Sequence, residues 1–162
     1  MASPTVVRSL TVDVSSPAET TAFGRQLASA LFPGAVMALV GPLGAGKTYL
    51  VRAIAEGLGI KNSRVVTSPT FVLIQEYDAR LPIYHFDVYR LGNVRDFVDL
   101  GVAEYFEGRG VSIVEWADRV AESLPAEHLR ITTTVTGEWT RRLQIEAFGP
   151  RHARLLEDAG FR

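Results

Sequence analysis

Short apolar runs alternate along this chain with segments of helical spacing, and the alternation predicts the order of the elements. Strand-like runs are rich in β-branched residues, whereas helical segments repeat apolar residues every three or four positions. The runs 36–40 and 111–115 are short and mostly apolar, as expected of strands covered on both faces of a sheet. The predicted strands are 6–14, 36–40, 71–77, 83–89, 111–115, 129–135 and 142–148; the predicted helices are 17–32, 47–58, short turns within 96–106, and a short helix in 150–162.

Two short connections fix the directions of some predicted strands. Residues 78–82 join strands 71–77 and 83–89, and a connection of this length forces an antiparallel pair. Residues 136–139 join the last two strands into a closing hairpin. The pattern predicts an α/β fold with a mixed central sheet and antiparallel hairpins. At 162 residues the chain is expected to form a single domain spanning 1–162.

The string GPLGAGKT occupies 41–48, between the predicted strand 36–40 and the predicted helix 47–58. In this G-x-x-x-x-G-K-[ST] pattern, called a P-loop, the glycines let backbone N–H groups surround a phosphate, and the helix N-terminus adds positive charge. Lys47 is expected to reach the β- and γ-phosphates, and Thr48 to ligate Mg²⁺. Because the flanking strand and helix are both present, the sequence predicts a P-loop NTPase-like three-layer sandwich that binds a nucleotide.

Two acidic residues lie where they could bind the metal ion or its water ligands. Asp87 follows the apolar residues of one predicted strand, and Glu115 ends another. Ligands collect where strands of an α/β sheet end, and Mg²⁺ in nucleotide sites is held partly by a carboxylate. Both acids are therefore candidate catalytic residues together with Lys47, and candidate metal-binding residues together with Thr48. The spacing does not decide which acid lies nearer the metal.

Other polar and aromatic residues have two interpretations each. Residues 67–70 (TSPT) either form a γ-phosphate-sensing loop or a turn that starts the next strand. His85 is interpreted as a strand residue whose ring is satisfied, because no partners for a ligand role are identifiable. Trp116 either flanks the nucleotide or packs in the core. Arg141 and Arg142 are either surface charges or contacts to the nucleotide.

Composition narrows the function classes. The net charge of -1 differs from the basic surface of a protein that holds nucleic acid by itself, so any contact with nucleic acid is expected to be indirect, through another subunit, and DNA binding is not expected. The sequence has no cysteine, and it shows neither a long apolar span nor a signal peptide. We therefore expect a cytoplasmic protein without a membrane association.

Four strings in this order, GPLGAGKT, TSPTF, YHFDVYR and VEWADR, resemble the bacterial TsaE (YjeE) family. The resemblance covers about 17–124 and implies a small ATPase that uses ATP and Mg²⁺. It implies support of threonylcarbamoyladenosine (t6A) formation at position 37 of tRNA, in a complex with TsaB and TsaD. It also implies that Thr48, Asp87 and Glu115 form the metal site. The adenine side of the nucleotide would be held by Ser16, Thr20 and Arg141.

The motif and the resemblance together give a set of nucleotide-binding candidates. These are Ser16, Thr20, Gly41, Leu43, Gly44, Ala45, Gly46, Lys47, Thr48, Tyr49, Thr70 and Arg141. Isolated hydrolysis is expected to be slow and stimulated by partners, since no arginine stands out as a finger. One alternative is a small-molecule kinase of the shikimate kinase type, although the stretch KNSRVVTSPTF lacks the acids of that class. Another is a binding module in which ATP only sets the shape.

Overall fold

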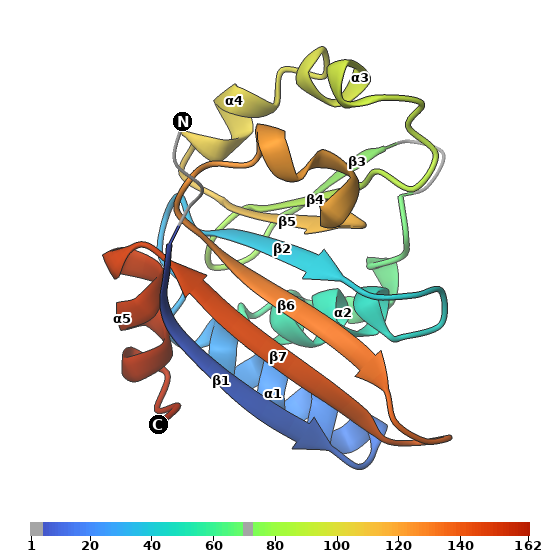
Figure 1. Ribbon diagram of the computed structural model, residues 1–162, viewed down its shortest axis with the longest axis vertical. Helices are drawn as coiled ribbons and strands as arrows, with labels where there is room; N and C mark the ends of the chain where they lie inside the picture. Colours follow the sequence, from blue (N-terminus) through green and yellow to red (C-terminus); the bar gives the residue numbers. More distant parts are fainter. Residues whose placement is uncertain (1–4, 70–72) are drawn as a thin grey trace.

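A computed structural model of the chain describes residues 5–69 and 73–162 (Figure 1). Within these residues a seven-stranded mixed sheet has the order β1-β7-β6-β2-β5-β4-β3. The strands are β1 (Val6–Val14), β2 (Val36–Val40), β3 (Ile74–Tyr77), β4 (Ile83–Asp87), β5 (Val111–Glu115), β6 (His128–Val135) and β7 (Arg141–Phe148). The helices are α1 (Pro17–Ala28), α2 (Lys47–Gly57), α3 (Val94–Val98), α4 (Val102–Phe106) and α5 (Pro150–Asp158), with 3-10 helices η1 (Ser63–Val65) and η2 (Ala117–Ser123).

The sheet is mixed because its central strands are parallel and its outer pairs antiparallel. β2 runs parallel to both β5 and β6, and β4 runs parallel to β5. The pairs β3–β4, β6–β7 and β1–β7 are antiparallel. The expected antiparallel pairs on either side of the buried central strands are therefore confirmed.

Helices lie on both faces of the sheet, which confirms the predicted sandwich. Helices α1, α2 and α5 cover one face, while η2, α3 and α4 cover the other face over β2, β5 and β4 (Figure 1). Each face has its own apolar core. The first core includes Leu27, Ile54 and Ile113, and the second includes Phe86 and Phe97. Among the described residues, no helix is both long and apolar enough to cross a bilayer.

Several predicted boundaries are wrong by a few residues, for local reasons. α1 ends at Ala28 rather than at 32, and the chain continues with shorter-range bonds from Ala30 N–H to Leu27 O and from Leu31 N–H to Ala28 O. A residue that precedes proline avoids the helical region, so a helix reaching Pro33 was disfavoured. β4 ends at Asp87 rather than at 89, because the Asp87 carboxylate accepts a hydrogen bond from Tyr89 N–H and bends the chain.

Other elements also differ from the sequence prediction. The turns expected in 96–106 are the separate helices α3 and α4, and the last helix ends at Asp158. The strand expected over 71–77 includes positions outside the described residues, and its described part begins at Ile74. The 3-10 helices η1 and η2 were not predicted.

Candidate functional site

The glycine-rich loop connects the end of β2 to the start of α2, as its sequence context predicts. Gly44 and Gly46 have left-handed φ values of 77° and 98°. A Cβ atom at either position would meet no atom within 4 Å, so backbone conformation rather than crowding favours glycine there. Helix α2 begins without a side-chain cap and without an acidic residue in its first turn. Its N-terminus therefore keeps its positive end available for an anion.

Lys47 lies over this loop with only 6 % of its surface exposed. Its Nζ donates hydrogen bonds to Gly41 O at 2.6 Å and Pro42 O at 2.8 Å, and it lies 4.0 Å from the centre of the Trp116 ring. Burial lowers the pKa of the Lys47 ammonium, while the negative charges of Glu115 and other nearby acids oppose this shift. The structure thus places a cationic donor at the mouth of the loop.

The two acids lie side by side at the ends of neighbouring parallel strands, where Asp87 pairs with Glu115 in the register of β4 and β5. Both residues are 2 % exposed. Thr48 Oγ1 donates to Glu115, with distances of 2.9 Å to Oε1 and 3.0 Å to Oε2. Ser68 Oγ donates a short hydrogen bond to Asp87 Oδ2. Two carboxylates and two hydroxyl groups therefore converge next to Lys47.

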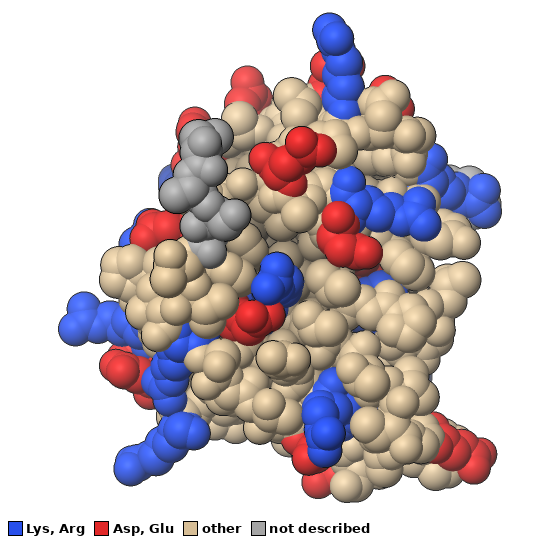
Figure 2. Space-filling model, in the orientation of Figure 1, with Lys and Arg blue, Asp and Glu red and all other residues tan. Residues whose placement is uncertain are grey.

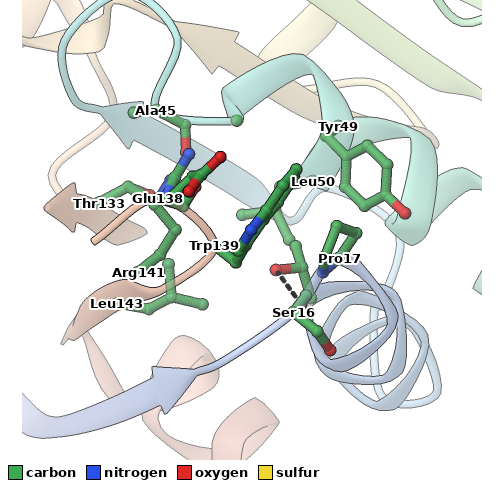
Figure 3. Close-up of a pocket in the computed structure, with 12 residues that line it drawn as sticks. Ser16, Pro17, Ala45, Tyr49, Leu50, Thr133, Glu138, Trp139, Arg141 and Leu143 are labelled. Atoms are coloured by element: carbon green, nitrogen blue, oxygen red, sulfur yellow. Dashed lines mark hydrogen bonds between the residues drawn. The ribbon is translucent and has the colours of Figure 1, made fainter. Parts of the chain in front are cut away.

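Two adjoining cavities surround the loop. The first has a volume of about 370 Å³ and is lined by Leu43, Gly44, Gly46, Lys47, Thr48, Tyr49, Ser68, Asp87, Tyr89, Glu115 and Trp116. The second, of about 220 Å³, is lined by Ser16, Pro17, Thr20, Ala45, Gly46, Tyr49, Leu50, Thr133, Glu138, Trp139, Arg141 and Leu143 (Figure 3). Gly46 and Tyr49 line both cavities, so the two can hold parts of one extended ligand.

The second cavity is built from three distant parts of the chain. Ser16 is the N-cap of α1, where its Oγ accepts a hydrogen bond of 3.2 Å from Glu19 N–H, and Thr20 follows on the first turn. Arg141 begins β7 and donates from Nε to Ala45 O at 3.2 Å, which ties the β6–β7 turn to the glycine-rich loop. Figure 3 shows Trp139 of that turn and Pro17 of α1 along the wall of this cavity.

Most of the candidates from the sequence come together in these two cavities. Gly41 lines neither cavity, but its carbonyl oxygen receives the Lys47 ammonium. Thr70 lies outside the described residues, so its role as a nucleotide contact stays a prediction. Arg142 is directed elsewhere, because its Nε donates to Asp13 Oδ1 at 2.9 Å.

Sequence reasoning assigned no site role to several residues that the structure brings to the site. Tyr89, Glu138 and Trp139 line the cavities without having been proposed. Ser68, from the segment 67–70 proposed as a γ-phosphate-sensing loop, and Trp116, for which core packing was the competing interpretation, line the first cavity. Trp116 has a positive φ of 62°, which is strained for a large side chain. His85 also reaches the site, because its Nε2 contacts the Glu115 carboxylate. Its period-2 spacing from Asp87 was the available signal, because both side chains then lie on the same face of β4.

The polar and charged groups of the first cavity fit a nucleoside triphosphate with Mg²⁺. Among the described residues, no cluster of three or more His, Cys, Asp or Glu side chains could hold a metal ion alone. Magnesium in nucleotide sites is usually shared between one or two protein oxygens, phosphate oxygens and water. The Thr48 hydroxyl and the two carboxylates match that partial shell, and the loop with Lys47 matches the charge of the phosphates.

The fold and the loop define a protein of the P-loop NTPase-like class. A family model described as "Threonylcarbamoyl adenosine biosynthesis protein TsaE" matches residues 14–143. The chain belongs to the TsaE family, which confirms the resemblance drawn from the sequence motifs.

Individual relatives are similar to this chain in sequence or structure over most of its length. The Bacillus subtilis (strain 168) protein named tRNA threonylcarbamoyladenosine biosynthesis protein TsaE is 46% identical over 144 residues, covering 88% of this chain and 89% of the relative. A protein of the same name from Treponema pallidum (strain Nichols) is 42% identical over 130 residues, covering 80% and 95%. The crystal structure of YdiB from Bacillus subtilis superposes with a TM-score of 0.83 at 40% identity and covers 96% of both chains.

Proposed function

We propose that this protein binds ATP with Mg²⁺ and hydrolyses the ATP in support of t6A formation on tRNA. One observation carries the proposal: Lys47, Thr48, Asp87 and Glu115 converge on one cavity beside the glycine-rich loop. The family relationship supports the tRNA modification context, because similar proteins carry t6A biosynthesis in their names. This role would take place in the cytoplasm, where tRNA is modified.

Each residue has a separate task in the proposed reaction. The loop amides and the Lys47 ammonium bind and orient the phosphates, and Lys47 exchanges its hydrogen bonds to Gly41 O and Pro42 O for phosphate oxygens. Thr48 and one carboxylate would hold Mg²⁺, which when bound neutralises charge on the phosphates. The other carboxylate would orient the attacking water. Asp87 and Glu115 both lie at the edge of the sheet where these tasks are performed, and Glu115 is the carboxylate that accepts the Thr48 hydroxyl.

The second cavity is suited to the nucleoside part of the ligand. It adjoins the loop and offers the flat side chains of Tyr49 and Trp139 together with the hydroxyl groups of Ser16 and Thr20. Aromatic faces stack on a base, while hydroxyl groups pair with polar edges of a sugar or base. We propose that ATP lies across both cavities, with its triphosphate toward Lys47.

We further propose that the protein acts with TsaB and TsaD, and that tRNA is contacted only through that complex. On the face shown in Figure 2, described Lys and Arg side chains are interspersed with Asp and Glu and form no continuous basic surface. The net charge of -1 is consistent with this picture. A protein that held tRNA alone would need several uncompensated cations.

Phosphate release from ATP tests the proposal directly. Hydrolysis is measured for the protein alone, with the TsaB and TsaD proteins of the same organism, and with each partner omitted. We expect slow release alone and faster release with both partners. Lys47→Ala and Glu115→Gln should abolish the stimulated rate, whereas Lys61→Ala, which changes an exposed lysine away from the cavities, should leave it unchanged. Transfer of phosphate to a metabolite, or binding of ATP without any release, would contradict the proposal.

A further inference from the structure

His85 is a fully buried histidine that contacts the acid paired with Thr48. It is 0 % exposed, and its Nε2 lies 2.5 Å from Glu115 Oε2. His85 belongs to β4 and Glu115 to the neighbouring β5, so the contact crosses between two parallel strands. The ring therefore reaches the same carboxylate that accepts the Thr48 hydroxyl.

The chemistry of the two partners assigns the direction of this hydrogen bond. A carboxylate only accepts, so Nε2 carries a hydrogen and donates a hydrogen bond to Glu115, whether or not Nδ1 is also protonated. On the other side of the ring, the Tyr77 hydroxyl oxygen lies 3.4 Å from Nδ1 and 3.4 Å from Thr67 O. Tyr77 is 6 % exposed, and its ring packs with a centroid distance of 6.1 Å to the His85 ring. The imidazole is thus held from both edges.

The contact with His85 restrains the Glu115 side chain, which would otherwise be free to rotate. Glu115 has three rotatable side-chain bonds, and a buried carboxylate needs donors to offset the loss of water. Here Oε2 receives the His85 N–H, and both oxygens lie within 3.0 Å of Thr48 Oγ1. Because the imidazole is fully buried and contacted at both ring nitrogens, it holds the carboxylate in the orientation that faces Thr48.

We propose that His85 is a positioning residue: its Nε2–H holds the Glu115 carboxylate against Thr48, so that the site accepts Mg²⁺ with the nucleotide without rearranging. This inference rests on the proposed function. Groups that orient metal-binding side chains commonly change metal affinity by about 10- to 100-fold when they are removed. A buried histidine that only filled the core would leave the Mg²⁺ dependence unchanged.

Two substitutions at this position separate orientation from packing. In His85→Gln the side-chain amide can take the place of Nε2 and donate to Glu115, whereas in His85→Asn the same amide is one methylene short of it. Binding of a non-hydrolysable ATP analogue is measured by calorimetry across a range of Mg²⁺ concentrations. We expect His85→Asn to raise the Mg²⁺ concentration for half-maximal enhancement of binding by about 10- to 100-fold. His85→Gln should stay close to the unmodified protein.

Binding of the analogue without Mg²⁺ should be the same in all of these proteins, because His85 does not line the cavity of the glycine-rich loop. Ile83→Val serves as the matched packing control, since Ile83 is also 0 % exposed and lies two residues earlier on the same face of β4. Thermal unfolding of each variant verifies that it folds. Should His85→Asn fail to fold, Tyr77→Phe, which removes the hydroxyl at Nδ1, should give a smaller shift in the same direction.

Two results would overturn the inference while leaving the proposed function intact. One is an unchanged Mg²⁺ dependence in His85→Asn, or in Tyr77→Phe where that variant stands in for it. The other is an equal loss in His85→Gln and His85→Asn, which would indicate packing alone. An unmodified protein that binds no nucleotide at any Mg²⁺ concentration would overturn both the inference and the proposed function.

Discussion

Acidification should destabilise the protein through His152, a buried histidine on α5. His152 is 3 % exposed, and its Nε2 accepts a hydrogen bond of 3.2 Å from Val36 N–H. Nε2 therefore carries no proton, and the Nδ1 atom has no hydrogen-bond partner among the described residues. Burial, followed by the positive charges of His128 and Arg151, lowers the pKa of His152 from 6.5 to about 4.

The sign follows from comparing proton binding in the two states. The unfolded chain takes up a proton near pH 6.5, whereas the folded protein resists protonation until about pH 4. Stability from this group is thus fully present above pH 6.5 and is lost as the pH falls toward 4. The difference of about 2.5 pKa units, from 6.5 to about 4, corresponds to roughly 3 kcal/mol. About 2 kcal/mol of this should be lost by pH 5.

Urea unfolding followed by circular dichroism, at several pH values between 8 and 5, measures this loss. The control is His152→Gln, whose side-chain oxygen can still accept from Val36 N–H but does not titrate. We expect the free energy of unfolding to fall more steeply with acidification in the unmodified protein than in His152→Gln. Parallel pH profiles for the two proteins would refute the reasoning.

Three further predictions concern packing and the second cavity. Gly24→Ala should destabilise the protein by about 1–3 kcal/mol, because the new Cβ would lie 2.5 Å from Ala53 Cβ where α1 crosses α2. Urea unfolding measures this loss, and an unchanged urea midpoint would contradict the close contact between the two helices. Phe97→Ala should cost about 3–5 kcal/mol, because its ring is 0 % exposed in the second core, and a loss below 1 kcal/mol would argue against that burial. Arg141→Ala should weaken ATP binding in calorimetry without altering its Mg²⁺ dependence, because Arg141 ties the β6–β7 turn to Ala45; unchanged affinity would exclude the second cavity as the nucleoside site.

Local patterns were sufficient to predict the elements that carry the site. The glycine-rich loop could be placed because a buried strand precedes it and an apolar helical stripe follows it. Asp87 and Glu115 could be proposed because each ends an apolar run, and parallel strands end at the same edge of a sheet. The structure adds that the two are direct neighbours in register.

Long-range pairing could not be predicted from the same patterns. The place of β1 beside β7 joins opposite ends of the chain, and no local spacing encodes such a pairing. The contact between His85 and Glu115 depends on β4 lying next to β5, so the partner of His85 was invisible in the sequence. The 3-10 helix η2 was missed because it has neither the length nor the apolar period of an α-helix.

The most direct test of the central claim is a calorimetric titration of ATP with Mg²⁺ into the unmodified protein and into Lys47→Ala. We predict one ATP bound per chain, and an affinity about 10- to 100-fold lower in Lys47→Ala, because the variant loses a charged donor at the loop. Equal affinity in the two proteins, or no heat of binding in the unmodified protein, would contradict the account.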